Sequence, residues 1–275
     1  MNSRRWTFGF LAVALALAFS FSTGCSTVPV TGRQQLNLIS PAQETELGLA
    51  SFTQLKKETP ISHDPAINKM VQRVGNRIAA VASQDLPDAR WEFVVFESKE
   101  ANAFCLPGGK VGVYTGILSI TKDEAGLATV IGHEVGHAVA HHGAERISEA
   151  MLLQGGGELL GSTLSSADPA WQQAAAVAYG AGTTLGRELP HSRKQESEAD
   201  HIGIMYMARA GYDPKAAVEF WQRFAEYNRQ QGQENSWLSK FLSTHPLNED
   251  RIAQLEQLLP AAEAEYARSK TLGAR

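Results

Sequence analysis

One motif constrains this chain more than any other: the stretch from Ile131 to Ala138 reads IGHEVGHA. On a helix, His133 and His137 lie one turn apart and about 40° apart around the axis, so both rings can reach one metal ion. Glu134 lies beside that face, where it can contact a metal-bound water without ligating the metal. The motif therefore predicts a zinc site on a helix. The alternative is an amphipathic helix that carries two core histidines.

Two glycines interrupt the same predicted helix. Gly132 and Gly136 are poor helix formers that cost about 0.8–1 kcal/mol each relative to alanine. We therefore expect another element to approach this helix closely.

A catalytic zinc site needs a third protein ligand, because water takes the fourth position. Residues 192–200, SRKQESEAD, predict the start of a second helix. Glu196 and Asp200 share one of its faces, whereas Glu198 points about 200° away from Glu196. That spacing suits Glu196 as a ligand and Asp200 as an acceptor for a hydrogen bond from a ligating histidine. We interpret Glu198 as part of a solvated acidic face.

The HExxH motif and the later ExxAD motif together resemble metallopeptidase family forty-eight, which includes the CAAX prenyl proteases and the HtpX-like proteases. Within it, the chain is most similar to the Oma-type bacterial lipoprotein peptidases. The resemblance runs from about residue 27 to the C-terminus. Besides the two motifs, it includes Asn102-Ala103-Phe104, Pro107-Gly108-Gly109, Ser192-Arg193, Gly211-Tyr212-Asp213-Pro214 and Thr244-His245-Pro246.

The resemblance implies a zinc endopeptidase with one zinc ion per chain. By it, His133, His137 and Glu196 are the ligands, Glu134 is the base and Asp200 orients His133. Together with the predicted elements, it indicates a mainly helical α+β fold of the zincin type, similar to the gluzincins, with a small antiparallel sheet packed on the HExxH helix.

The N-terminus has the features of a targeting segment. In residues 1–24, two arginines precede an apolar run of signal-peptide length, slightly shorter than the ~20 residues of a usual spanning helix. Ser22-Thr23-Gly24-Cys25 resembles a lipobox, which predicts a lipid on Cys25. By analogy, Ser26 after it favours the outer membrane. We expect a lipid-anchored, periplasm-facing protein of the bacterial cell envelope. A secreted or uncleaved, anchored protein is the alternative.

Beyond this leader, we expect an N-terminal tether and helix over residues 25–60 and a zinc metallopeptidase domain over 61–275. Residues 26–39 are predicted to be an extended lead-in. Capping signals at Ser40 and Asp64 predict two helices. A capping box at Thr121–Glu124 is predicted to open the HExxH helix, which should reach about His141.

Residues 90–96, 101–105 and 110–114 read as strands, the last two joined by a Pro-Gly-Gly turn. The edge of such a sheet can bind an extended peptide as an added strand. The resemblance assigns this role to Asn102, Ala103 and Phe104. A hairpin that only packs on the helix is the alternative. Cys105 is expected to be a buried packing residue.

Three other features bear on the site. His245 is our first candidate for a catalytic donor to the developing oxyanion, with a fourth metal ligand or a buried structural residue as alternatives. We interpret His141 and His142 as structural residues at a helix C-terminus. The Gly-rich, Ala-rich and Ser-rich segment 151–190 predicts a mobile helical flap.

These observations predict an endopeptidase that hydrolyses misfolded or damaged envelope or outer-membrane proteins, by attack of a zinc-bound water that Glu134 assists. One alternative is a chaperone-like binding factor of the envelope with a latent protease site. Another is hydrolysis of a substrate other than a peptide. The formal net charge of −4, without a basic patch, argues against nucleic acid as a partner.

Overall fold

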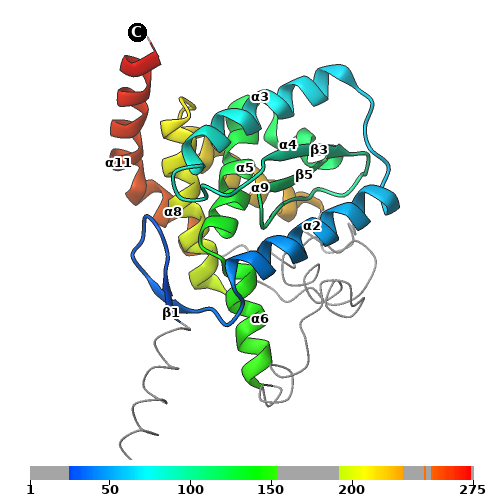
Figure 1. The fold of residues 1–275 in the computed structure, drawn as a ribbon. Coiled ribbons are helices and arrows are strands. Elements are labelled where there is room, and N and C mark those ends of the chain that lie inside the picture. The colour runs from blue at the N-terminus through cyan, green and yellow to red at the C-terminus, as the bar shows by residue number, and fades with distance from the viewer. Residues whose placement is uncertain (1–24, 154–191, 232–244, 246–248, 274–275) are drawn as a thin grey trace, which may run out of the picture.

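The computed structural model describes residues 25–153, 192–231, 245 and 249–273 (Figure 1). The mainly helical α+β prediction is confirmed. The predicted leader and almost all of the predicted flap lie outside the described residues. In chain order, the elements are β1 (Cys25–Thr27), β2 (Gln34–Leu36), α2 (Pro41–Glu58), α3 (Pro65–Ala82), β3 (Glu92–Phe96), β4 (Ala103–Leu106), β5 (Lys110–Tyr114), the 3-10 turn Thr115–Ile117, α4 (Leu118–Thr121), α5 (Glu124–Val139), α6 (His142–Leu153), α8 (Arg193–Arg209), α9 (Lys215–Gln231) and α11 (Glu249–Gly273).

The helix starts follow the capping chemistry of the sequence. Ser40 and Gln43 form a reciprocal capping box on α2, and the Asp64 carboxylate caps α3. The start of α5 differs from the prediction, because its N-cap is Asp123 rather than Thr121. Thr121 ends the short helix α4, and Lys122 separates the two helices with a φ of 66°.

The three-stranded sheet has the order β3-β5-β4 and is mixed rather than antiparallel. The predicted β4–β5 hairpin is antiparallel, and its turn places Gly108 and Gly109 at φ values of 77° and 76°. β3 instead runs parallel to β5. On the side of β3 away from β5, Ile61 forms an antiparallel bridge with Phe96. After β3, the chain crosses to the opposite edge of the sheet, where β4 pairs with β5.

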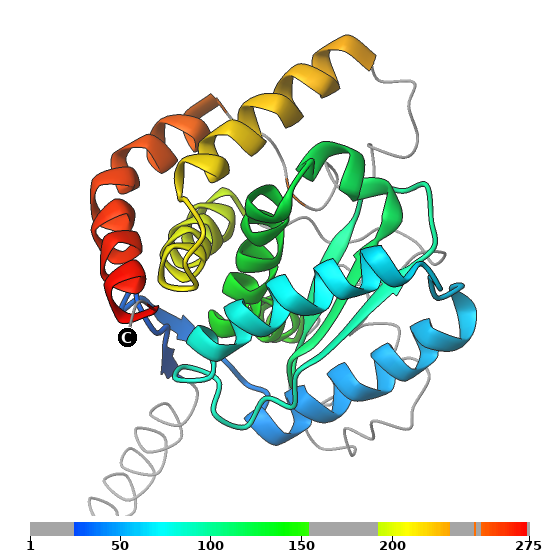
Figure 2. The same ribbon diagram turned by 90° about the horizontal axis from the view of Figure 1, so that it is seen from above.

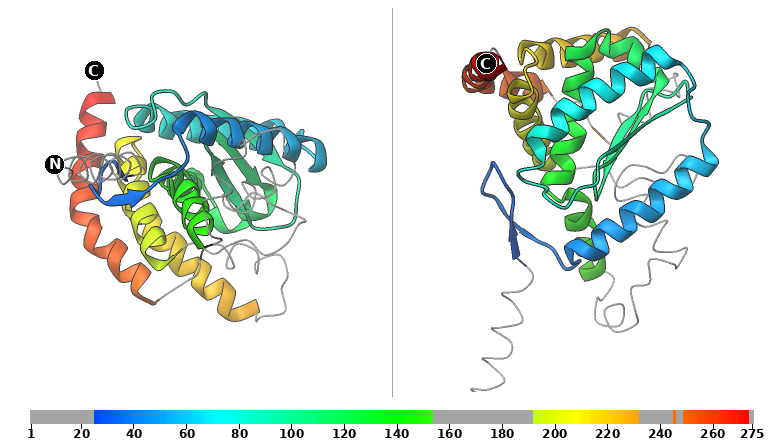
Figure 3. Two further views of the ribbon diagram at one scale, coloured as in Figure 1. Left: turned by 60° about the horizontal axis from the view of Figure 1, so that its bottom comes forward. Right: turned by 45° about the horizontal axis from the view of Figure 1, so that its top comes forward.

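Helices cover both faces of this sheet (Figures 2 and 3). Alternate strand residues point to opposite sides, as the pleat requires. One face packs with α3 and α5 in the main core, and the other packs with α2 in a smaller aromatic cluster. Beyond α5 lie α8 and then α11, so α5 is the central helix. Cys105 is buried on the α5 side, which confirms the packing role.

The glycines of α5 have the predicted explanation. A Cβ atom on Gly132 would lie 2.9 Å from the carbonyl oxygen of Gly203, and one on Gly136 would lie 2.7 Å from that of Ala199. Both contacts are with α8. The two helices therefore pack with their backbones nearly touching, which brings the HExxH face within reach of the ExxAD face.

The expected extended lead-in is a β-hairpin. β1 and β2 pair in antiparallel register, and the Val28 amide donates to the Arg33 carbonyl at 2.8 Å. Val30 and Gly32 take φ values of 70°, which reverse the chain between the strands. The hairpin lies beside α6 and the start of α8 (Figure 1). Among the described residues, none of the helices is both long enough and apolar enough to cross a membrane.

Candidate metal centre and active site

Four buried side chains meet between α5 and α8: His133, His137, Glu196 and His245. The His133 and His137 Nε2 atoms are 3.1 Å apart, and His133 Nε2 is 3.2 Å from His245 Nδ1. The Glu196 Oε1 atom lies 3.1 Å from His245 Nδ1 and 3.2 Å from His137 Nε2. The structure thus brings the three predicted ligands together and adds His245 to them.

This donor set fits a metal ion. Ligands about 2.0–2.1 Å from a common ion lie about 3.3–3.4 Å apart in a tetrahedron, close to the spacings found here. Imidazole nitrogens with one carboxylate form a donor set that suits zinc and other first-row metals. The cluster could therefore hold a metal ion by both its spacing and its chemistry.

The Glu134 carboxylate lies at the edge of this cluster. It is buried, and its Oε1 atom accepts no hydrogen bond from the described residues. That oxygen lies 3.5 Å from His245 Nε2. Burial raises the pKa of Glu134 above its ordinary value, against the opposing charges of His245 and His133. A buried acceptor to which no described residue donates, beside a candidate metal site, is suited to accept the proton of a water.

Glu196 is held in its ionised form. Burial alone would raise the pKa of this carboxyl, but the charges of His245 and Arg251 and the close contacts with His133 and His137 keep it well below its usual range. The form that binds a metal is thus the stable one.

We call the support behind His133 the inner arm; it consists of His133, Asp200 and Arg251. Asp200 Oδ1 accepts from His133 Nδ1 at 2.9 Å, as the family resemblance implied. Arg251 lies on α11 and donates to Asp200 twice, from Nε to Oδ2 at 2.5 Å and from Nη2 to Oδ1 at 2.9 Å. Its Nη1 atom lies 2.8 Å from Glu196 Oε2. Its guanidinium lies 3.6 Å from the centre of the Trp221 ring. No sequence pattern pointed to Arg251.

We call the support behind His137 the outer arm; it consists of His137, His142, Glu198 and Arg33. His137 Nδ1 lies 2.8 Å from His142 Nδ1, and His142 Nε2 lies 3.0 Å from Glu198 Oε2. Arg33 Nε donates to the same Glu198 oxygen at 2.6 Å. The interpretation of Glu198 from sequence was wrong, because this side chain is buried rather than solvated. His142 is a buried structural residue, but it begins α6 rather than ending the HExxH helix, and it contacts a predicted ligand.

Ionisation of Glu198 follows from these contacts. Burial opposes the charge, but hydrogen bonds from His142, Thr31 and Arg33 lower its pKa to about 2. The doublet of histidines after the HExxH motif was the available signal for His142. Nothing local to α8 revealed that Arg33, far back in the sequence, would reach Glu198.

The predicted substrate strand lies beside the catalytic face. β4 is an edge strand of the three-stranded sheet. Its Cys105 thiol lies near Glu134: burial is the main cause that raises the pKa of this thiol, and the charge of Glu134 raises it further. Ala103 and Phe104 are buried, and the ring of Phe104 packs in the aromatic cluster. Asn102 stands before the strand, and its carbonyl accepts from the Tyr114 amide at 3.0 Å.

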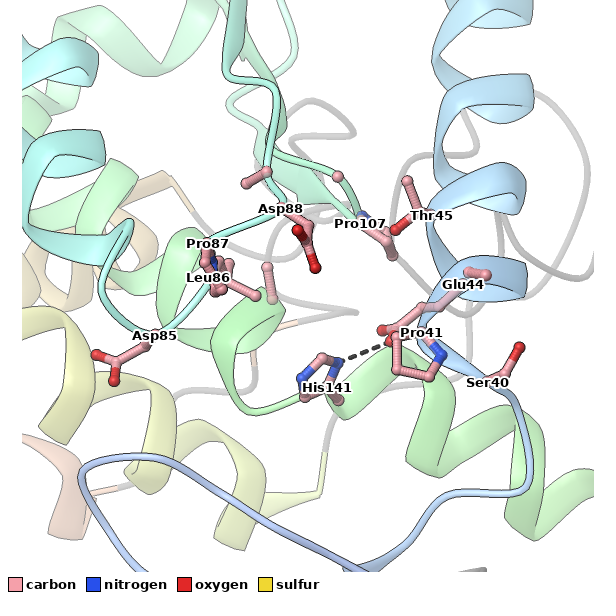
Figure 4. A pocket seen from close by; sticks show the side chains of 14 residues that line it. Ser40, Pro41, Glu44, Thr45, Asp85, Leu86, Pro87, Asp88, Pro107 and His141 are labelled. Carbon is pink, nitrogen blue, oxygen red and sulfur yellow. Dashed lines mark hydrogen bonds and ion pairs between the residues drawn. The ribbon is translucent and has the colours of Figure 1, made fainter.

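A separate cavity of about 790 Å³ lies beyond the C-terminal end of α5 (Figure 4). It is lined by α2, the loop after α3 and the β4–β5 turn, and it contains none of the four metal donors. His141 points into it and contacts Glu44 at 2.7 Å. His141 thus faces away from the metal site, although its neighbour His142 supports that site.

A buried metal-donor set on two helices, with a glutamate and an edge strand beside it, defines a metal-dependent peptidase of the zincin type. The chain belongs to peptidase family M48, whose sequence model matches residues 65–259.

Comparison with curated relatives agrees with this family. The chain is 35% identical over 264 residues to the mitochondrial metalloendopeptidase OMA1 of Schizosaccharomyces pombe, which covers 94% of this chain and 73% of the relative. It is 28% identical over 269 residues to the beta-barrel assembly-enhancing protease of Escherichia coli K12, which covers 94% of this chain and 54% of the relative. The chain is a metalloendopeptidase.

Proposed function

We propose that this chain is a zinc-dependent endopeptidase that hydrolyses misfolded or misassembled proteins of the bacterial cell envelope. The observation that carries the proposal is the buried set of four donors with the Glu134 carboxylate beside it. His133, His137 and Glu196 would hold the ion. Zinc, when bound, supplies a Lewis acid that stabilises negative charge on the substrate carbonyl oxygen and makes water more acidic.

The proton transfers belong to Glu134. Its buried carboxylate, with a pKa raised by that burial, takes a proton from the attacking water at Oε1 and passes it to the amine of the broken peptide bond. Glu196 cannot compete for this proton, because its pKa is held well below the usual range. The two glutamates therefore have separate roles set by their surroundings.

His245 has its Nδ1 atom among the metal donors and its Nε2 atom 3.5 Å from Glu134 Oε1. This placement supports the role of a fourth ligand in a closed state over that of an oxyanion donor. In that role, His245 would exclude the water that catalysis needs. The enzyme is then latent until His245 leaves this position.

A peptide substrate would bind along the edge of β4. Because Ala103 and Phe104 are buried, their backbone rather than their side chains would provide the contacts. Backbone pairing gives affinity with little side-chain discrimination, which suits unfolded chains of varied sequence. The low exposure of this strand means that substrate entry also requires a local opening.

The location and the substrates rest on separate support. The lipobox-like sequence before Cys25 supports a lipid anchor in the envelope. The Escherichia coli relative carries the name beta-barrel assembly-enhancing protease, whereas the Schizosaccharomyces pombe relative is named as mitochondrial. We infer an outer-membrane location facing the periplasm, with misassembled envelope proteins as substrates.

The test compares the full zinc-loaded chain in detergent with Glu134→Gln and His245→Ala variants, using unfolded casein and following fragments over time. We expect the parent to cleave slowly, Glu134→Gln to lose at least about a hundredfold in rate while keeping zinc, and His245→Ala to cleave faster than the parent. Slower cleavage by His245→Ala would favour the oxyanion role. Zinc binding without cleavage by any of the three would favour the binding-factor alternative.

A further inference from the structure

The N-terminal hairpin reaches the support of the metal site through Arg33 and Thr31, and Arg33 makes the more extensive contacts. Arg33 Nε lies 2.6 Å from Glu198 Oε2 on α8, and its Nη1 and Nη2 atoms lie 2.5 Å and 3.0 Å from the two oxygens of Glu145 on α6. The Arg33 side chain is only 14% exposed. A guanidinium clamped by two carboxylates at a largely buried position has a fixed geometry.

Among the described residues, Glu198 receives most of its hydrogen bonds from this hairpin. The Thr31 hydroxyl donates to Oε1 at 2.5 Å, and Arg33 donates to Oε2. The remaining donor is His142 Nε2 at 3.0 Å. The position of the carboxylate is therefore set jointly by the hairpin and by the first residue of α6.

This geometry determines which ring nitrogen carries the proton, first in His142 and then in His137. A carboxylate only accepts, so His142 carries its proton on Nε2 and leaves Nδ1 as an acceptor. His137 Nδ1, 2.8 Å away, must then donate to His142 Nδ1. His137 therefore carries its proton on Nδ1, and its Nε2 lone pair points to the other metal donors.

We propose that Arg33 is a positioning residue for the metal site, which makes the hairpin Cys25–Leu36 a structural part of that site. Acting through Glu198 and His142, Arg33 holds His137 in the tautomer and orientation that bind the ion. The inference rests on the proposed zinc site. It further connects the metal to the segment that begins at Cys25, where the lipid anchor is predicted, so displacement of the hairpin weakens metal binding.

The experiment uses the full chain in detergent, with Arg33→Gln, Glu198→Gln and the double variant. Zinc affinity is measured by competition with a chromophoric chelator, and the visible spectrum of the cobalt-loaded protein reports the ligand geometry. Arg33→Gln should weaken zinc binding about tenfold, at the low end of the range for groups that support a metal ligand, and should alter the cobalt spectrum. The double variant should bind no more weakly than Glu198→Gln alone, because both changes act on one path.

The matched control is Arg73→Gln. Arg73 also forms an ion pair that touches α5, with Glu124 at the opposite end of that helix, but the two side chains are 45% and 35% exposed. This variant should keep the zinc affinity and the cobalt spectrum of the parent. Thermal unfolding of the metal-free proteins separates a loss of fold from a loss of metal binding.

The possible outcomes separate the two proposals. A parent that binds no zinc overturns both the proposed function and this inference. A parent that binds one zinc, beside a folded Arg33→Gln protein with unchanged affinity and spectrum, overturns the inference alone. Additive losses in the double variant also overturn it. If Arg33→Gln does not fold, Glu198→Gln decides, because unchanged zinc affinity in that protein contradicts the path through Glu198.

Discussion

The two ligand histidines of α5 are supported from opposite sides by two different arrangements. In the inner arm, the Asp200 carboxylate bridges His133 and Arg251, whose Nη2 atom also lies 3.2 Å from each ring nitrogen of His133 and whose side chain is 1% exposed. In the outer arm, His142 and Glu198 both stand between His137 and Arg33, whose side chain is 14% exposed. Each arm ends on an arginine that neutralises a carboxylate of α8.

The arms also differ in where their arginines come from. Arg251 lies within the residues 65–259 that match the family model, whereas Arg33 lies before them. In the inner arm, the contacts behind His133 are few and buried, so the core fixes the position of this ligand. In the outer arm, more residues stand behind His137, and the last of them, Arg33, belongs to the N-terminal hairpin. The position of His137 therefore depends on a peripheral segment. The comparison predicts that the inner arm governs stability and the outer arm adjusts metal binding.

The largest effect should come from Arg251→Gln. Arg251 is paired with both Asp200 and Glu196, and its loss removes the arginine charge that these two buried carboxylates share. Removing one partner of such a buried arrangement costs about 3–5 kcal/mol. Urea unfolding of the metal-free variant should show a loss of this size, and added zinc should recover part of it.

Arg209→Gln is the control for that experiment. Arg209 also joins α8 to α11, through Glu265 at 3.4 Å, but its side chain is 35% exposed. Its replacement should cost no more than about 1 kcal/mol. If Arg251→Gln were no more destabilising than Arg209→Gln, the inner arm would not be the more rigid support.

A smaller effect should separate Asp200→Asn from Glu198→Gln. The amide that Asp200→Asn introduces can present an N–H group to His133 Nδ1, which would favour the tautomer that points a proton at the metal. Loss of a carboxylate partner of a ligand histidine costs about 10–100-fold in metal affinity. Zinc competition should show a greater loss for Asp200→Asn than for Glu198→Gln, because His142 lies between Glu198 and the ligand. Equal losses would remove the distinction between the arms.

The inner arm, apart from Arg251, was predictable from the sequence, because it uses local periodicity. Two histidines four apart and two acids four apart each share a helix face, and the glycines beside the histidines indicated the close helix packing. Capping residues likewise placed α2 and α3. Each of these signals acts within a few turns of one helix.

The outer arm and the sheet topology depend on contacts that such signals do not encode. Glu198 points away from Glu196 and seemed solvated, since its partner Arg33 is distant in sequence. Arg251 stands at no position that any motif marks. The sequence predicted an antiparallel sheet, whereas β3 pairs in parallel with β5, and this pairing between distant segments has no local signal.

The adjacent histidines after α5 offer the finest test of the comparison. His142 faces the metal ligands, whereas His141 faces the cavity and contacts Glu44 (Figure 4). Burial alone would lower the pKa of His141, but the hydrogen bond and the charge of Glu44 raise it above the ordinary value. The two residues should therefore separate stability from metal binding.

His141→Asn should change stability slightly and only at lower pH. Asparagine tolerates the left-handed backbone at this position, where φ is 52°, so the change removes the charge without strain. Because the folded-state pKa is raised, the ion pair stabilises fully below the unfolded value of about 6.5 and is lost as pH rises through the folded value. Urea unfolding at pH about 6 should show a loss below about 1 kcal/mol that disappears at higher pH. Zinc affinity should stay unchanged in His141→Asn and fall in His142→Asn. A loss of zinc affinity in both variants would mean that the end of the helix, and not the outer arm, supports His137.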